Sequence, residues 1–240
     1  RLAADRTPDV RAGKPAPSPP GRPPRQRVGI VGVGHRARAT YLPLLTALGD
    51  RGVLAMVCDS TNVFVEGEAG SEASVREALK ELIAGLEGRV AVTTFASNVA
   101  RVKSVIEAAA EAGRSVCLVG RSMHKVTDAA IQTGILKNLP DFVDEEDAGA
   151  LPPDNILYLC TGSQGEPRAA LSRIARGDHR NVTLGEGDTV VFSSRVIPGN
   201  EKGIFAMMNA LADAGVRVIT DRMTKTPIHV SGHPCRDELT

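Results

Sequence analysis

Val53-Leu54-Ala55-Met56-Val57-Cys58-Asp59-Ser60-Thr61-Asn62 is the stretch around which the rest of this sequence is organised. Residues 53–58 are apolar, too few for a helix, and followed by polar residues that favour a turn, so they predict a buried strand. Asp59 then stands at the carboxyl end of that strand. Ligands of open α/β sheets bind at this edge, which makes Asp59 a candidate for chemistry. The ordinary role of a lone Asp, an N-cap for the following segment, is the alternative.

Composition sets the broad class. The 240 residues are enough for one large or two small domains, and the net charge of +1 does not by itself indicate a nucleic-acid binder. The four cysteines have no paired spacing, which is typical of reduced core residues. No apolar run approaches the ~20 residues of a membrane span, and no cleavable leader is visible. We therefore expect a soluble, cytoplasmic protein without a membrane partner.

The two ends of the chain differ from its middle. Residues 1–27 contain seven of the fifteen prolines and seven basic residues, with almost no large apolar side chain. Such a segment buries too little surface to offset its ordering entropy, so we predict a disordered leader. The sequence begins with Arg1 and stops at Thr240, in what resembles the first turn of a helix. We expect it to be a fragment.

Residues 28–46 carry a glycine fingerprint. A predicted strand runs into Gly32-x-Gly34-x-x-Ala37 and then a helix, and Asp59 follows about twenty residues on, where a ribose-binding acid belongs. This short stretch is similar to the opening of the Gfo/Idh/MocA oxidoreductases. The resemblance implies a nicotinamide cofactor bound through Gly32, Gly34 and Asp59. The lysine-bearing motif of that family is not recognisable in this chain.

Beyond Asp59, apolar runs alternate with helix-period patterns. This alternation predicts an α/β fold with a doubly wound, mostly parallel, Rossmann-like sheet. The predicted strands are 89–95, 115–119, 156–160, 189–194 and 216–220, and the predicted helices are 71–86, one opened by Ser97-Asn98, 167–176 and 201–214.

Four of these strands end in small polar residues followed by Gly, Arg or a helix start. Carboxyl ends of parallel strands share one edge, and helix N-termini and Arg side chains there suit phosphate. A capped helix start is the ordinary explanation of each segment alone, but four together favour a phosphate-bearing ligand. The segments are Ser97-Asn98, Gly120-Arg121-Ser122, Thr161-Gly162-Ser163-Gln164-Gly165 and Ser193-Ser194-Arg195.

The same residues resemble ribonuclease J, a bacterial member of the β-CASP branch of the metallo-β-lactamase superfamily, from about residue 47 to residue 239. The motifs occur in the family's order and approximate spacing. They are Asp59-Ser-Thr-Asn62, Thr94-Phe-Ala-Ser-Asn98, Gly120-Arg-Ser-Met123, Leu159-Cys-Thr-Gly-Ser-Gln-Gly-Glu166, Ser193-Ser-Arg-Val-Ile-Pro-Gly-Asn-Glu201 and His229-Val-Ser-Gly-His233.

This resemblance implies RNA as the partner, two zinc ions that generate a hydroxide, and a homo-oligomer in the complete protein. Asp59 would be the bridging metal ligand. His233 would donate a proton to the leaving oxygen and be held by Glu72. The residues expected to contact RNA or its phosphates are His229, Ser231, Ser97, Asn98, Arg121, Ser163, Gln164, Gly165, Ser193 and Ser194.

The resemblance also implies a division of the chain. After the leader we expect a strand-helix-strand unit over 28–62, either a Rossmann-like opening or a lactamase-domain remnant. A β-CASP domain over 63–226 follows, and 227–240 returns to the lactamase domain. Asp59 and His233 are expected to meet where the chain leaves and re-enters that domain.

One departure from the family concerns the metal. The family's His-x-His-x-Asp-His zinc motif is missing, since the only histidine before residue 124 is His35. One carboxylate does not hold a zinc pair, so we expect the chain as given to lack the metal site. Three functions stay open at this point: a metal-dependent ribonuclease, an NAD(P)-binding oxidoreductase, and a non-catalytic RNA-binding module.

Overall fold

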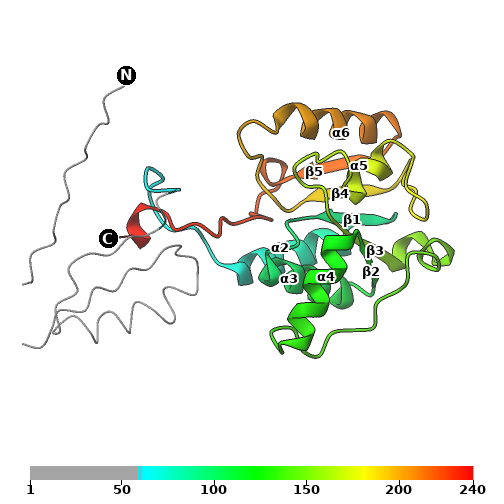
Figure 1. Ribbon diagram of the computed structural model, residues 1–240, viewed down its shortest axis with the longest axis horizontal. Helices are drawn as coiled ribbons and strands as arrows, with labels where there is room; N and C mark the ends of the chain where they lie inside the picture. The colour runs from blue at the N-terminus through cyan, green and yellow to red at the C-terminus, as the bar shows by residue number, and fades with distance from the viewer. Residues whose placement is uncertain (1–58, 60, 240) are drawn as a thin grey trace, which may run out of the picture.

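A computed structural model describes residue 59 and residues 61–239. Within them five strands form one sheet in the order β2-β3-β1-β4-β5, and every neighbouring pair is parallel (Figure 1). This confirms the predicted α/β class and parallel sheet. The strands are β1 (Val90–Thr93), β2 (Ser115–Val119), β3 (Ile156–Cys160), β4 (Thr189–Phe192) and β5 (Arg217–Thr220).

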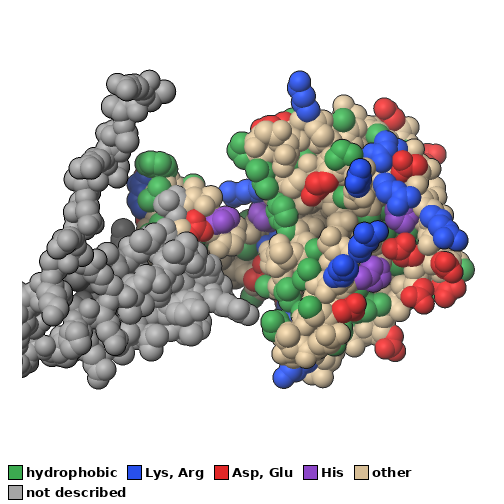
Figure 2. Space-filling model, viewed as in Figure 1, with side chains coloured by type: hydrophobic (Ala, Val, Ile, Leu, Met, Phe, Trp, Pro, Cys, Tyr) green, Lys and Arg blue, Asp and Glu red, His purple; other side chains and the backbone are tan. Residues whose placement is uncertain are grey.

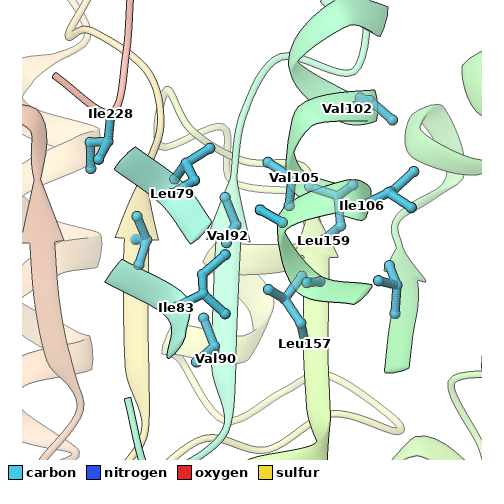
Figure 3. Close-up of a cluster of buried hydrophobic side chains, with 14 of the residues drawn as sticks. Leu79, Ile83, Val90, Val92, Val102, Val105, Ile106, Leu157, Leu159 and Ile228 are labelled. Atoms are coloured by element: carbon cyan, nitrogen blue, oxygen red, sulfur yellow. The ribbon is translucent and has the colours of Figure 1, made fainter. Parts of the chain in front are cut away.

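Helices cover both faces of the sheet, as a doubly wound fold requires (Figure 1). On one face α2 and α3 pack against the strands through Leu79, Ile83 and Ile106 (Figure 3). On the other, Ile204 of α6 lies in a second apolar cluster. Strands buried on both faces read as continuous apolar runs, which is why the sequence revealed them. The helices are α2 (Glu72–Ala84), α3 (Val99–Glu111), α4 (Arg121–Gln132), α5 (Ala170–Ala175) and α6 (Glu201–Asp213).

Two helices begin at N-cap residues of the types that favour this position, Ser71 and Asn98. The Ser71 hydroxyl accepts a hydrogen bond from the Ser74 amide at 3.1 Å and starts α2. The Asn98 side-chain oxygen accepts one from the Arg101 amide, also at 3.1 Å, and starts α3. Each cap satisfies a backbone donor that has no partner within its helix. These starts agree with the predicted helices.

Helix α4 was not predicted from the sequence. Its buried face consists of Met123, Thr127 and Ala130, two of them small, so the apolar periodicity is weak. The turn before it depends on Gly120, which has φ 107°. A Cβ atom at Gly120 would collide with the Thr161 hydroxyl of the neighbouring loop. Tertiary packing therefore decides where α4 forms.

Other expectations concern the surface and the cysteines. Figure 2 shows acidic and basic side chains interspersed on the visible face of the sheet domain, in keeping with the net charge of +1. Cys117, Cys160 and Cys235 are buried and unpaired, as predicted. Burial raises the pKa of the Cys117 thiol to about 12, so this thiol is unreactive.

Residues 59 and 61–239 include no helix that is long and apolar enough to cross a membrane. The predictions for the leader 1–27 and for Gly32 and Gly34 lie outside the described residues. The proposed strand 53–58 and His35 lie outside them too.

Candidate functional site

The sheet brings the ends of β1 and β4 side by side, and the segment that begins at Ile228 packs against them. The Thr94 hydroxyl, directly after β1, donates to the Ser193 carbonyl after β4 at 3.2 Å. The Asp221 carboxylate, after β5, accepts hydrogen bonds from the amides of Ile228 at 3.0 Å and His229 at 3.3 Å. Asp221 therefore holds the start of the 228–233 segment. Asp221 lies in none of the motifs noted in the sequence.

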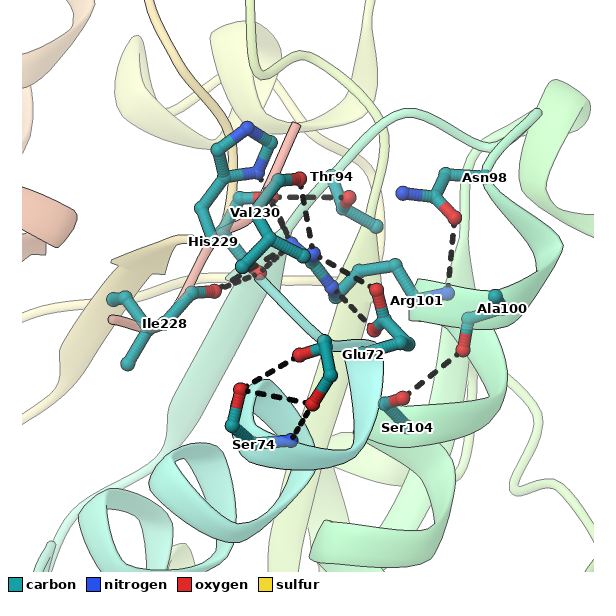
Figure 4. Close-up of polar contacts among 12 residues, drawn as sticks. Glu72, Ser74, Thr94, Asn98, Ala100, Arg101, Ser104, Ile228, His229 and Val230 are labelled. Atoms are coloured by element: carbon teal, nitrogen blue, oxygen red, sulfur yellow. Dashed lines mark hydrogen bonds and ion pairs between the residues drawn. The ribbon is translucent and has the colours of Figure 1, made fainter. Parts of the chain in front are cut away.

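Arg101 of α3 is the centre of this arrangement (Figure 4). Its side chain is 0% exposed. Nε donates to Glu72 Oε1 at 2.6 Å and Nη2 donates to Glu72 Oε2 at 3.0 Å. Nη1 donates to the Ser193 hydroxyl at 2.8 Å and lies 3.1 Å from Nδ1 of His229. One buried cation thus joins α2, α3, the end of β4 and the 228–233 segment.

His229 is neutral at pH 7 in this setting. Burial lowers the pKa of His229, and the positive charges of Arg101 and Arg195 lower it further, to about 4. An uncharged imidazole still offers one N–H donor and one acceptor. His229 is therefore a neutral hydrogen-bonding group beside a buried cation.

Asp59 and His233 are 174 positions apart and are in direct contact through Oδ2 and Nδ1. The other carboxylate oxygen of Asp59 accepts from the Thr61 hydroxyl at 2.6 Å and the Thr61 amide at 2.9 Å. Partial burial acts to raise the pKa of Asp59, but the hydrogen bonds from Thr61 and His233 outweigh it and lower the pKa to about 2. The carboxylate is therefore ionised at neutral pH. The side chain of His233 is 54% exposed and open to solvent.

Ser231 lies between His229 and His233 in the sequence. Its hydroxyl oxygen accepts from the Asn62 side-chain amide at 3.0 Å and from the His233 amide at 3.1 Å. A hydroxyl has two lone pairs and one proton, so both acceptor positions are used. The proton donates to no group in the described part of the chain, so it is free to bind an anionic oxygen.

Some predicted RNA-contacting residues form hydrogen bonds within the protein. Ser193 is fully buried, and its hydroxyl donates to the Ile228 carbonyl at 2.6 Å. Gln164 donates to the Arg195 carbonyl at 2.8 Å and accepts from the Ile197 amide at 2.9 Å. Their polar atoms hold the loops at the sheet edge. Gly165 belongs to the same packing, because its backbone lies against that of α6.

The remaining predicted residues are spread along the edge. Asn98 caps α3. Ser97 and Arg121 are exposed, whereas Ser163 and Ser194 are buried. Arg121 follows β2, which is the outermost strand and is separated from β1 by β3. The structure therefore forms two clusters, Glu72 with Arg101 and His229, and Asp59 with Ser231 and His233, which the chain from His229 to His233 connects, and Arg121 belongs to a different end of the edge.

The structure pairs Glu72 and His233 with different partners. The resemblance implies that Glu72 holds His233, but Glu72 binds Arg101 and His233 binds Asp59. Among the described residues no hydrogen bond or ion pair joins Glu72 to His233. Arg101 was missed at the sequence level, since an arginine in an amphipathic helix ordinarily lies on the solvated face.

The described residues do not by themselves fit a zinc pair. Nowhere among residues 59 and 61–239 do three His, Cys, Asp or Glu side chains come together as metal ligands. Asp59 offers one carboxylate and His233 one imidazole, whereas a protein zinc site usually takes at least three protein ligands.

Comparisons with known proteins agree with this arrangement of elements. The family model "Ribonuclease J, beta-CASP domain" matches residues 87–211. Ribonuclease J of Sinorhizobium meliloti is 52% identical over 192 residues, which are 80% of this chain and 34% of that protein. Ribonuclease J of Mycobacterium tuberculosis strain H37Rv is 46% identical over 203 residues, 84% of this chain and 36% of that protein.

Ribonuclease J of Thermus thermophilus is 38% identical over 202 residues, again 84% of this chain and 35% of that protein. The chain thus spans about a third of the length of the curated relatives it matches. The family model itself covers more than half of the 240 residues. The chain therefore belongs to the ribonuclease J family, with the β-CASP domain of that family at residues 87–211.

Proposed function

We propose that this chain is the β-CASP part of an enzyme that cleaves RNA phosphodiester bonds. The observation that carries the proposal is the contact between Asp59 and His233, which stand on either side of the β-CASP region in the sequence. The relatives named ribonuclease J, 38–52% identical, support RNA as the substrate. In this proposal 63–226 is the β-CASP domain and 227–240 is the return segment.

The return segment supplies the groups that would meet a phosphate. His229 is a neutral donor, the Ser231 hydroxyl proton has no acceptor among the described residues, and the His233 imidazole reaches solvent. Asp59 binds His233 through Nδ1, which leaves Nε2 directed away from the carboxylate. In our proposal Asp59 accepts a hydrogen bond from the Nδ1 proton and so orients His233, and the doubly protonated ring gives its Nε2 proton to the leaving oxygen of the cleaved bond and is left as neutral imidazole. A positioned general acid of this kind contributes about 10²–10⁴-fold to a rate.

The resemblance implies zinc ions, and Asp59 is the one described residue that we propose as a zinc ligand. We propose that Asp59 is the residue by which this chain would ligate zinc, when further ligands complete the site. The lowered pKa of Asp59 supports this role, since a metal binds the ionised carboxylate. We further propose, from the resemblance alone, a cytoplasmic homo-oligomer for the complete protein, which sedimentation of the complete protein would test.

No observation favours the two alternative functions. The oxidoreductase alternative rests on Gly32, Gly34 and Asp59, whereas the relatives that the chain matches over about four-fifths of its length are named ribonuclease J. Direct titration of the chain with NAD and NADP is expected to show no saturable binding. A non-catalytic RNA-binding module predicts RNA affinity that falls with salt, and no cleavage in any context.

The decisive experiment restores the missing parts of the site. Residues 47–240 are spliced into the complete Sinorhizobium meliloti relative, and cleavage of a labelled single-stranded RNA is compared between variants. Asp59→Ala should lose both zinc content and cleavage. His233→Ala should keep its zinc and slow cleavage by roughly 10²–10⁴-fold. His124→Ala, which removes an exposed histidine of α4, is the matched control and should cleave normally.

A fully active His233→Ala chimera would leave the family membership standing but refute the proposed proton donor. An Asp59→Ala chimera that retains its zinc would refute the ligand. RNA binding by the chimera with no cleavage under any condition would favour the non-catalytic module instead.

A further inference from the structure

We propose that Arg101 is a positioning residue for RNA cleavage, because it holds His229 with Nδ1 as a hydrogen-bond acceptor and so directs Nε2–H toward an RNA phosphate oxygen. The inference rests on the proposed function. It adds a residue that lies in none of the motifs noted in the sequence.

The chemistry of arginine determines the direction of the hydrogen bond. The guanidinium of arginine has five N–H donors and no acceptor, and it stays protonated in proteins. Nη1 of Arg101 lies 3.1 Å from Nδ1 of His229. This contact is a hydrogen bond only when Nδ1 carries no proton. The single proton of the neutral ring must then be on Nε2, at the opposite side of the imidazole.

Arg101 is itself fixed in place. Its two-point ion pair with Glu72 leaves the guanidinium a single orientation, and the Ser193 hydroxyl fixes Nη1 from another side. The guanidinium also reaches the carbonyls of Ile228 and Val230, at 3.5 and 3.4 Å. These two residues flank His229, so Arg101 contacts the ring and the backbone on both sides of it. A lysine has no planar fork and cannot reproduce this set of bonds.

The positive charge of Arg101, like its position, disfavours a proton on Nδ1 of His229. A proton on Nδ1 would face the buried cation of Arg101, with Arg195 nearby, and the Ser193 carbonyl and Asp221, which act in the opposite direction, are outweighed. Burial further disfavours the charged ring, which is why the pKa of His229 falls to about 4. His229 thus stays an uncharged donor with one fixed tautomer at neutral pH.

The test is a long-range ¹H–¹⁵N correlation spectrum of the histidine rings in the 240-residue chain, recorded at pH 7 without RNA. The His229 signals are assigned by their loss in His229→Gln. The wild-type protein should show an unprotonated Nδ1 and a protonated Nε2. Arg101→Lys, which keeps the charge but not the planar fork, should shift both nitrogens toward averaged tautomers.

Arg114→Lys is the matched control. Arg114 is also a buried arginine, but among the described residues its guanidinium hydrogen-bonds to backbone carbonyls, including those of Gly88 and Ile156 at the amino ends of the strands. This variant loses a buried fork as well, and it should leave the His229 signals unchanged. A shift of equal size in both variants would show that general loosening, not the Arg101 contact, controls the ring.

Two other results would overturn the inference: a wild-type His229 that is protonated on Nδ1 at pH 7, or an Arg101→Lys protein with the wild-type spectrum. The wild-type spectrum alone decides the tautomer if Arg101→Lys fails to fold. Because no RNA is present, an inactive chimera would refute the proposed function without altering this result.

Discussion

The carboxylate of Glu72, at the first residue of α2, forms a two-point ion pair with the guanidinium of Arg101 in α3, at 2.6 Å and 3.0 Å. The arginine side chain is completely buried, whereas that of Glu72 is 30% exposed. The pair therefore brings a full positive charge into the interior at the place where the 228–233 segment crosses the sheet edge. The contacts around Arg101 therefore depend on Glu72 neutralising this charge.

We expect Glu72→Gln to lower the free energy of unfolding by about 2 kcal/mol, because the buried guanidinium loses its only anionic partner among the described residues. Urea unfolding monitored by circular dichroism measures the change. Glu77→Gln, on the same helix, removes an exposed ion pair with Arg76 and should cost no more than about 0.5 kcal/mol. Equal losses in the two variants would contradict a special role for the buried pair.

Stability should depend on pH through His229. Its pKa is about 4 in the folded chain and near 6.5 in an unfolded one, so the unfolded chain binds a proton first as the pH falls. The free energy of unfolding should be unaffected by this group above pH 6.5 and decline by roughly 3 kcal/mol between pH 6.5 and pH 4. Urea unfolding at pH 7, 5.5 and 4.5 measures the decline.

His229→Gln is the control for this pH dependence, because its side chain does not titrate. Asp59, with a pKa of about 2, loses its stabilising effect only below pH 4 and does not interfere. If the variant keeps the wild-type slope between pH 6.5 and pH 4.5, another group is responsible.

Gly165→Ala should be far more damaging than an ordinary glycine substitution. Gly165 has φ +71°, and a Cβ atom there would collide with the Gly203 backbone and lie 2.6 Å from the Ile204 amide nitrogen. We expect a loss of at least about 3 kcal/mol, the sum of backbone strain and steric overlap. Gly177→Ala has nearly the same φ, +70°, and open space around its Cβ position.

Gly177→Ala should therefore show the backbone strain alone, about 1–2 kcal/mol. Thermal unfolding of the two variants side by side separates strain from contact. Similar melting temperatures would mean that α6 can move away from Gly165 at little cost.

Gln164→Ala tests whether Gln164 is a loop clamp. Its side chain bonds the Arg195 carbonyl and the Ile197 amide, so the variant should expose that amide to solvent. We expect hydrogen exchange at Ile197 to accelerate at least tenfold in the absence of RNA, with a stability loss of about 1–2 kcal/mol. Thr133→Ala, which removes a hydroxyl bonded at the exposed end of α4, is the control and should leave exchange at Ile197 unchanged. Unaltered exchange at Ile197 in Gln164→Ala would show that Gln164 does not hold the loop, and would favour its predicted role as an RNA contact.

Much of the fold was predictable because local signals agree with it. The strands of the sheet appear in the sequence as short apolar runs, and Ser71 and Asn98 mark helix starts that the structure keeps. Helix α4 escaped prediction, since Met123 is the only large residue on its buried face. Its place is set by the Gly120 turn and by packing on the sheet, neither of which has a strong local pattern.

The sequence predicted which residues belong to the candidate site better than it predicted the contacts between them. Asp59 and His233 were expected to meet and are in contact, and the role proposed for each awaits the chimera. The sequence could not tell that Ser193 and Gln164 turn inward, because a polar residue after a strand reads the same whether it faces solvent or a neighbouring loop. Arg101 looked like one more surface residue of an amphipathic helix.

The sequence by itself thus determined the alternation of strands and helices, the parallel sheet and the family, because these follow from apolar periodicity and from motifs read along the chain. Only the tertiary structure decided that Arg101 is buried and that Glu72 is its counterion rather than the partner of His233. A buried charge is stable only where acceptors from distant segments converge on it, and the convergence of α2, β4 and residues 228–230 on one guanidinium exists only in the folded chain.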